Sequence, residues 1–152
     1  MNTPLGNLEA TAELSVGLMF SIMRNIHLAN DSTHQGKWEK PKFLGTELKG
    51  KVLGIVGYGN IGQRVAEICS TIGMKIITNS KSASDDDLSK FDVKKVSTED
   101  LIKEADIISL HTKLNDETKY MINKETLSTM KPTSVIITVS YTHLTLPTNG
   151  LV

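Results

Sequence analysis

The chain has 152 residues but only one cysteine, no excess of either charge and no long hydrophobic run. The single cysteine, Cys69, excludes an internal disulfide and offers no metal-ligand spacing, as is typical of proteins from a reducing cytoplasm. Seventeen basic and seventeen acidic residues cancel, and no basic stripe indicates nucleic-acid binding. No apolar run approaches the roughly 20 residues that cross a bilayer, and the N-terminus lacks a secretory signal pattern. We therefore expect a soluble, cytoplasmic domain with neither nucleic-acid nor membrane partners and no metal site.

The first part of the chain has the apolar spacing of a helix over about residues 9–28. Apolar side chains recur there every four residues, at Leu14, Leu18, Ile22 and Ile26, with Met19 and Met23 beside them. This spacing predicts one amphipathic helix whose apolar face, methionines included, fills the core. The polar stretch 30–46 is predicted to be a connecting loop.

Short apolar runs then alternate with helical segments. Strands are predicted at residues 51–56, 75–78, 93–96, 106–110 and 134–138. Helices are predicted from the segment after Gly57 to a stop at Gly73, over 98–104 behind a Ser97–Asp100 capping box, and from Asn123 to before Pro132. The stretch 80–92 is predicted to be a polar loop. This alternation predicts an α/β fold, a Rossmann-like doubly wound parallel sheet, truncated and preceded by an N-terminal interdomain helix.

A glycine-rich motif, Gly57-Tyr58-Gly59-Asn60-Ile61-Gly62, follows the first predicted strand and opens the next helix. In that context the spacing Gly-x-Gly-x-x-Gly is typical of dinucleotide binding. Gly57 permits the tight turn, Gly59 lets the backbone approach a pyrophosphate, and Gly62 lets the helix pack on the sheet. Free N–H groups and the positive end of the helix dipole would hold the anion. The alternative is a tight strand-to-helix turn without a ligand.

The end of the second predicted strand is where NAD and NADP should be distinguished. An acid there, about 20 residues after the motif, would bind the ribose hydroxyls of NAD. This chain has Asn79-Ser80-Lys81-Ser82 instead, and its acidic run Asp85-Asp86-Asp87 comes too late. Two hydroxyls and a cation favour a 2′-phosphate, and therefore NADP over NAD. The alternative is a solvated Lys81, with NAD bound without a carboxylate.

Most of the chain resembles the D-isomer-specific 2-hydroxyacid dehydrogenase family. The matching residues include Gly45-Thr46-Glu47-Leu48, the run from Leu53 to Gln63, Glu104-Ala105-Asp106-Ile107-Ile108-Ser109-Leu110-His111, Asn115-Asp116-Glu117-Thr118 and Met130-Lys131-Pro132. Upstream, residues 12–14, 24–26 and 36–38 resemble the interdomain helix of the family and the loop after it. The resemblance implies a two-domain enzyme, homodimeric when intact, that transfers hydride between NAD(P) and C2 of a 2-hydroxy or 2-oxo acid.

The resemblance also implies cofactor contacts at individual residues. Asn60 and Ile61, with Tyr58 in the same motif, would meet the pyrophosphate, and Ser80 stands where the family usually has its ribose-binding Asp. The remaining contacts implied are at Lys81, His111, Thr112, Thr118 and Val139. We interpret His111 as shaping the cofactor pocket, because the catalytic His of the family lies much further toward the C-terminus. His27 and His34 are expected on the surface.

The catalytic set of the family is not found. Its substrate-binding Arg, whose planar fork suits a carboxylate, would fall at position 141, where this chain has Tyr141. The Glu and His of the acid/base pair would come later still. We therefore assign residues 1–138 to an incomplete dinucleotide-binding domain, expect no substrate domain, and assign no catalytic residue.

Residues 139–152 match an in-frame translation of a transposase adapter used in sequencing libraries, and we interpret them as an artefact; a divergent natural tail is the alternative. An Arg codon at position 141 on re-sequencing would support the artefact. Two alternatives to the dehydrogenase interpretation remain at this point. One is a non-catalytic, corepressor-like dinucleotide-binding module, and the other is a non-functional fragment with an open sheet edge.

Overall fold

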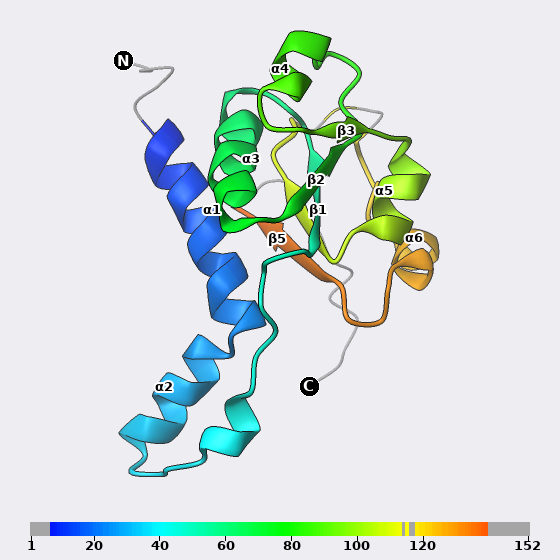
Figure 1. Cartoon of the computed structure of the whole chain (residues 1–152). Helices are drawn as coiled ribbons and strands as arrows, with labels where there is room; N and C mark the ends of the chain where they lie inside the picture. Colours follow the sequence, from blue (N-terminus) through cyan, green and yellow to red (C-terminus); the bar gives the residue numbers. More distant parts are fainter. Residues whose placement is uncertain (1–6, 114, 116–117, 140–152) are drawn as a thin grey trace.

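A five-stranded parallel sheet forms the centre of the computed structural model, which describes residues 7–113, 115 and 118–139 (Figure 1). Its strands are β1 (Val52–Val56), β2 (Lys75–Thr78), β3 (Lys94–Lys95), β4 (Ile107–Leu110) and β5 (Val135–Thr138). They lie in the order β3-β2-β1-β4-β5. The chain therefore places β2 and β3 on one side of β1 and then crosses back to place β4 and β5 on the other side. This reversal between β1 and β4 is where open parallel sheets bind ligands, at the carboxyl ends of the strands.

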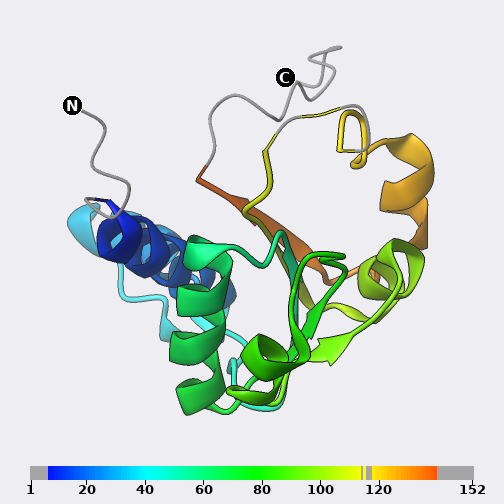
Figure 2. The ribbon, with the colours of Figure 1, turned by 90° about the horizontal axis from the view of Figure 1, so that it is seen from above.

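Helices cover both faces of the sheet (Figure 2). The helices α1 (Leu8–Met23) and α3 (Asn60–Ile72) share one core with Leu53, Ile55 and Ile107. The helix α5 (Thr98–Glu104) forms the other core with Val56 and Ile108, and α6 (Lys124–Thr129) lies beside it. Successive residues of β1 and β4 thus point to opposite cores, which is why these central strands are mostly apolar. The predicted Rossmann-like doubly wound sheet is confirmed.

Local signals in the sequence determine where several elements begin and end. The strand β2 and the helix α5 have the bounds predicted for them, and the Ser97 side chain accepts a hydrogen bond from the Asp100 N–H. Gly73, with φ of 90°, ends α3 in the left-handed conformation that glycine adopts without strain. Asn123 caps α6 with a capping box, and that helix ends before Pro132. Within the predicted loop 80–92, Ser84 caps an additional short helix, α4 (Asp85–Ser89).

The prediction of one long N-terminal helix was wrong. The chain breaks after α1 at Asn25, which has a left-handed φ of 54°, and continues as α2 (Ile26–His34). Asn is one of the few residues that adopts this conformation at low cost. The predicted loop 30–46 accordingly begins inside α2, and it also contains a 3-10 turn, η1 (Lys40–Phe43).

The apolar face predicted for residues 9–28 was right only in part: Met19 is fully buried, and Leu18 and Met23 pack against the core. Leu14 and Ile26 are instead 51% and 52% exposed, and the buried residues of α1 are Ala12, Ser15, Val16 and Met19. The small Ala12 and Ser15 allow α1 to pack closely against α3, and the Ser15 hydroxyl is satisfied by donating to the Thr11 carbonyl at 2.8 Å. Leu14 lies outside this contact. In the described part of the chain, no helix is long and apolar enough to span a membrane.

Candidate functional site

The carboxyl ends of β1 and β4 meet at Gly57. The His111 N–H donates to the Val56 carbonyl at 2.8 Å, so the backbone after β4 runs directly alongside the turn after β1. Gly57 has a φ of 91°, and a Cβ built on it would lie 2.7 Å from the His111 carbonyl carbon and 2.8 Å from the Thr112 nitrogen. Only glycine fits both this conformation and this contact. The turn is therefore held at the sheet reversal, next to His111 and Thr112.

The helix α3 begins at this turn with exposed N–H groups. Gly59 is its N-cap in an extended conformation, no side chain of the described residues caps it, and the first turn carries no acidic residue. A Cβ on Gly59 would meet nothing within 4 Å, so the space in front of the helix is open. A Cβ on Gly62, in contrast, would overlap the Gly57 carbonyl oxygen and lie 3.2 Å from Ile55 Cγ2. Backbone donors facing open space at a helix N-terminus are suited to bind an anion.

Tyr58, between these glycines, turns its side chain into the core. It is 3% exposed and packs in the same cluster as Ala83 and Leu88, and its hydroxyl has no hydrogen-bond partner among the described residues. Burial raises the pKa of Tyr58, with a smaller contribution from Asp87. A contact of Tyr58 with a cofactor would therefore involve its backbone, while exposed Asn60 and half-buried Ile61 lie in the first turn of α3.

The loop after β2 is held by hydrogen bonds on both sides. The fully buried Thr78 hydroxyl donates to the Ile55 carbonyl at 2.8 Å and accepts from the Ser80 N–H at 3.3 Å. Asn79 Nδ2 donates to Thr98 Oγ1 at 2.9 Å, which ties the loop to α5. The Oγ atoms of Ser80 and Ser82 lie 3.3 Å apart. The chain thus presents a pair of hydroxyls at the carboxyl edge of the sheet, at the position where an acid would bind the hydroxyls of the adenosine ribose.

A lysine on the neighbouring strand joins this loop and was missed in the sequence. Lys95 Nζ donates to the Lys81 carbonyl at 3.2 Å from β3, the edge strand that pairs with β2. The signal was present, because the predicted strand 93–96 should end at the same edge as β2.

His111 is half-buried, and its ring contacts the sheet. Its Nε2 lies 2.8 Å from the hydroxyl of Ser109, a fully buried residue of β4, and burial lowers the pKa of His111 to about 4. The imidazole is therefore neutral at pH 7 and held against the strand. This geometry is compatible with a pocket wall, and that interpretation of His111 stays a prediction.

The remaining predicted contacts fall on the segments after β4 and β5. Thr112 adjoins Gly57, while the Thr118 hydroxyl is used within its own loop, donating to the Lys113 carbonyl at 2.8 Å and accepting from the Asn115 N–H at 2.9 Å. Val139 directly follows β5 and is the last residue that the structure describes. Tyr141 and the rest of residues 140–152 lie outside the described residues. No group of three or more metal-ligating side chains occurs in the described part of the chain.

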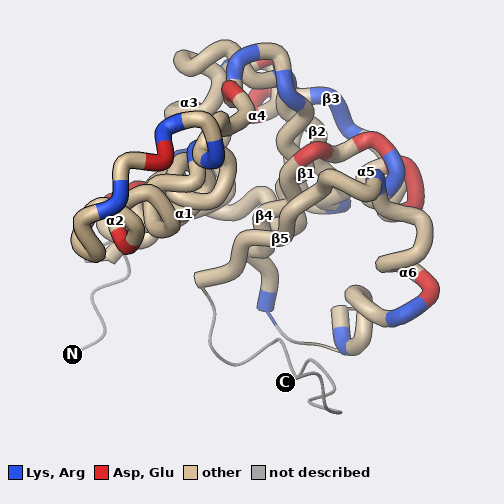
Figure 3. The backbone as a smooth tube through the Cα atoms, turned by 90° about the horizontal axis from the view of Figure 1, so that it is seen from below, with Lys and Arg blue, Asp and Glu red and all other residues tan. Residues whose placement is uncertain are grey.

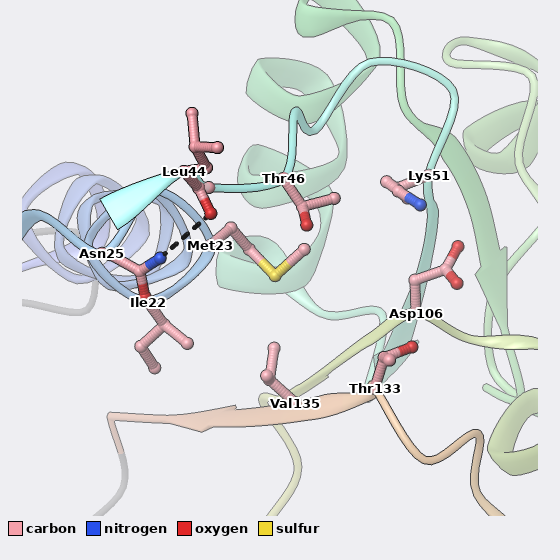
Figure 4. A pocket seen from close by; sticks show the side chains of 10 residues that line it. Ile22, Met23, Asn25, Leu44, Thr46, Lys51, Asp106, Thr133 and Val135 are labelled. Atoms are coloured by element: carbon pink, nitrogen blue, oxygen red, sulfur yellow. Dashed lines mark hydrogen bonds between the residues drawn. The ribbon is translucent and has the colours of Figure 1, made fainter. Parts of the chain in front are cut away.

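A cavity of about 330 Å³ lies at the opposite, amino edge of the sheet (Figure 4). It opens between the α1–α2 break and the starts of β1, β4 and β5, and Asp106 lies on its wall. Asp106 accepts from the Val52 N–H and from Lys131 Nζ, both at 2.8 Å. Burial raises the pKa of Asp106, but the two hydrogen bonds and the charges of Lys131 and Lys51 together outweigh it, so the pKa lies below its usual value. None of the predicted cofactor contacts lines this cavity.

Residues 16–145 match the model of the D-isomer specific 2-hydroxyacid dehydrogenase, NAD binding domain. The chain belongs to this family. Among curated D-2-hydroxyacid dehydrogenase relatives, it is 42% identical over 137 residues to hydroxypyruvate reductase from Thermotoga maritima, covering 90% of this chain and 44% of the relative. It is 40% identical over 140 residues to D-3-phosphoglycerate dehydrogenase from a Synechocystis strain, covering 92% of this chain and 25% of the relative. The chain thus spans less than half the length of these curated relatives.

Solved structures of the family have the same fold. A structure described as the pyruvate reductase of Chlamydomonas reinhardtii superposes with a TM-score of 0.83 at 32% identity, covering 88% of this chain and 39% of that one. An acyclic imino acid reductase in complex with NADPH and D-Arg superposes with a TM-score of 0.77 at 34% identity, covering 87% and 42%. The chain is therefore an NAD(P)-binding domain of a D-2-hydroxyacid dehydrogenase, a family of oxidoreductases.

Proposed function

We propose that this chain binds the dinucleotide in the crevice between Gly57 and the segment after β4. The observation that carries the proposal is the uncapped N-terminus of α3, with open space in front of Gly59 and close packing behind Gly62. The N–H groups of Asn60 and Ile61 would hold the pyrophosphate, as at other helix N-termini. His111 and Thr112, with Thr118 and Val139, would line the part of the pocket beyond the turn. When bound, the nicotinamide supplies or accepts the hydride, and the residues named here bind and orient it.

We propose NADP rather than NAD as the preferred cofactor. At the end of β2, where an acid would bind both ribose hydroxyls of NAD, the chain has Ser80 and Lys81. The hydroxyl pair of Ser80 and Ser82 and the positive charge of Lys81 suit a 2′-phosphate, which an acid would repel. The solved relatives include an NADPH complex, so the fold accommodates that cofactor.

In the whole protein, we propose that this domain serves hydride transfer between NAD(P) and a small 2-hydroxy or 2-oxo acid, most like that of D-3-phosphoglycerate dehydrogenase. The proposal rests on the similarity to the relatives of that name and of hydroxypyruvate reductase. We further propose a homodimer in the cytoplasm. Exposed apolar side chains along α1 and α2 support a protein interface; they are Leu14, Ile22, Ile26 and Leu28. The free, buried Cys69 suits a reducing compartment.

Titration of the purified chain with NADPH and with NADH, followed by nicotinamide fluorescence, tests the cofactor site. We expect saturable binding of both, with NADPH the tighter ligand. ADP-ribose, which carries the pyrophosphate and the adenosine but no nicotinamide, should displace either one. Tighter binding of NADH would contradict the preference for NADP. Failure of both cofactors to bind a chain that folds by circular dichroism would overturn the site itself.

A further inference from the structure

Lys95 reaches the carboxyl edge of the sheet from β3, whereas the residues predicted from the sequence to distinguish NADP from NAD lie in the loop after β2. In the parallel pairing of β2 with β3, Lys95 is the partner of Thr78, the last residue of β2. Both strands therefore end at the same level, and Ser80 lies only two residues beyond. From this position the Lys95 ammonium crosses to the loop and donates to the Lys81 carbonyl at 3.2 Å. Figure 3 shows the basic residues of β3 at the edge of the sheet.

The two serines on either side of Lys81, whose carbonyl this ammonium contacts, have side chains suited to bind a phosphate. Ser80 Oγ and Ser82 Oγ lie 3.3 Å apart, and each hydroxyl can donate to a phosphate oxygen. An ammonium adds a charge-assisted hydrogen bond, which is stronger than a neutral one. The loop is already fixed by the Thr78 hydroxyl and by the bond from Asn79 to Thr98. Little ordering of the loop would therefore be needed on binding.

The acidic residues that follow Ser82 most closely along the chain, Asp85, Asp86 and Asp87, lie on α4. Asp87 accepts a hydrogen bond from Lys90 Nζ at 2.8 Å and one from the Ser84 hydroxyl at 2.7 Å. These bonds lower the pKa of Asp87, with the bond from Lys90 the largest cause. The Asp87 carboxylate is thus paired with a lysine of its own, whereas Lys95 contacts the loop.

We propose that Lys95, with Ser80 and Ser82, forms the subsite for the 2′-phosphate of NADPH and is a specificity-determining residue for this cofactor. The inference rests on the proposed function, because the same crevice must hold the rest of the dinucleotide. It adds a phosphate ligand from β3 to the residues of the loop after β2. A lysine that merely braced the loop would support NADH and NADPH alike, whereas a phosphate ligand supports only NADPH.

The test compares Lys95→Met, which keeps the aliphatic stem, with Lys94→Met, which removes the same charge from the neighbouring position. Adjacent residues of a strand point to opposite faces, so Lys94 is a matched control. Affinities for NADPH, NADH and the fragment 2′,5′-ADP are measured for both variants and for the unaltered chain. We expect Lys95→Met to weaken NADPH and 2′,5′-ADP about tenfold or more and to leave NADH within about twofold. Lys94→Met should change none of the three beyond about twofold.

Each other outcome refutes a different statement. Equal weakening of NADPH and NADH by Lys95→Met would show a bracing role and overturn the subsite. Equal effects of Lys95→Met and Lys94→Met would show that only the overall charge matters, and an unaltered affinity for NADPH would exclude Lys95 altogether. If the unaltered chain binds NADH but not NADPH or 2′,5′-ADP, the subsite fails while the dinucleotide site stands. If it binds none of them, the proposed function fails and the subsite with it.

Discussion

Gly62→Ala and Gly59→Ala should separate the folding role of the glycine motif from its binding role. The two residues are three positions apart, at the start of α3, and gain the same methyl group. Behind Gly62 that methyl would overlap the Gly57 carbonyl oxygen, and it would lie 3.2 Å from Ile55 Cγ2. In front of Gly59 it would meet nothing within 4 Å. The same substitution therefore acts on packing at one position and on the ligand space at the other.

The expected losses of stability depend on whether the groups next to each new methyl can move away from it. A backbone carbonyl cannot rotate away as a side chain can, so α3 must shift from β1, and overpacking of this kind costs about 1–3 kcal/mol. Alanine gains up to about 1 kcal/mol over glycine in a helix, which offsets part of the loss. We expect Gly62→Ala to lower the free energy of unfolding by about 2 kcal/mol, or Tm by about 4–8 °C. Gly59→Ala should cost only about 0.5 kcal/mol, as an N-cap without a clash.

Urea unfolding measures the stability of both variants, and cofactor titration of the same preparations measures their binding. Gly59→Ala should keep its stability and lose at least about tenfold in affinity for NADPH and NADH alike, since its methyl would occupy the space proposed for the pyrophosphate. If Gly62→Ala proves as stable as the unaltered chain, the packing argument is refuted. If Gly59→Ala binds both cofactors unchanged, the pyrophosphate does not lie in front of α3.

Three further substitutions test individual groups. His111 has a folded pKa of about 4, below that of an unfolded chain, so its contribution to stability is complete above about pH 6.5 and is lost as the pH falls toward 4. In urea unfolding, His111→Gln should therefore remove about 2 kcal/mol of the stability loss between pH 7.5 and pH 5. An unchanged dependence of stability on pH would contradict the burial of the imidazole. Tyr58→Phe removes a buried hydroxyl without a partner and should raise stability by about 1 kcal/mol, whereas a loss would mean that the hydroxyl is bonded. Asp106→Asn weakens the bond from Lys131 and should lower stability by about 1–2 kcal/mol with NADPH affinity unchanged, because it acts at the opposite edge; a change in affinity would show that the two edges are coupled.

The sequence predicted the elements whose ends are set by nearby residues. Ser97 and Asn123 satisfy backbone donors within three residues, and Gly73 adopts a conformation that disfavours other residues. Apolar residues occur on both faces of the central strands β1 and β4, as expected of a sheet that helices cover on both sides. These features depend on a few consecutive residues, so the doubly wound fold could be inferred without knowledge of distant contacts.

The N-terminal helix could not be predicted in the same way, because its burial depends on a partner far along the chain. Spacing alone favours the Leu14–Ile22 side of α1, which has the larger apolar residues. The structure instead buries Ala12, Ser15, Val16 and Met19, and the small Ala12 and Ser15 allow α3 to approach closely. The break at Asn25 likewise leaves the helical periodicity almost intact, so the apolar pattern continues across two helices.

The candidate site shows the same division between local and distant information. The glycine motif and Ser80 could be found because each lies in a short segment with its own conformational demands. For Lys95 the sequence predicted only the strand 93–96, because its contact with the Lys81 carbonyl depends on the parallel register of β2 and β3 and on the length of a lysine side chain. If the proposed subsite is correct, the cofactor preference of this chain depends on β3 as well as on the loop after β2, because both end at the same edge of the sheet. If Lys95→Met alone abolishes the preference for NADPH, the edge strand is as informative as the loop.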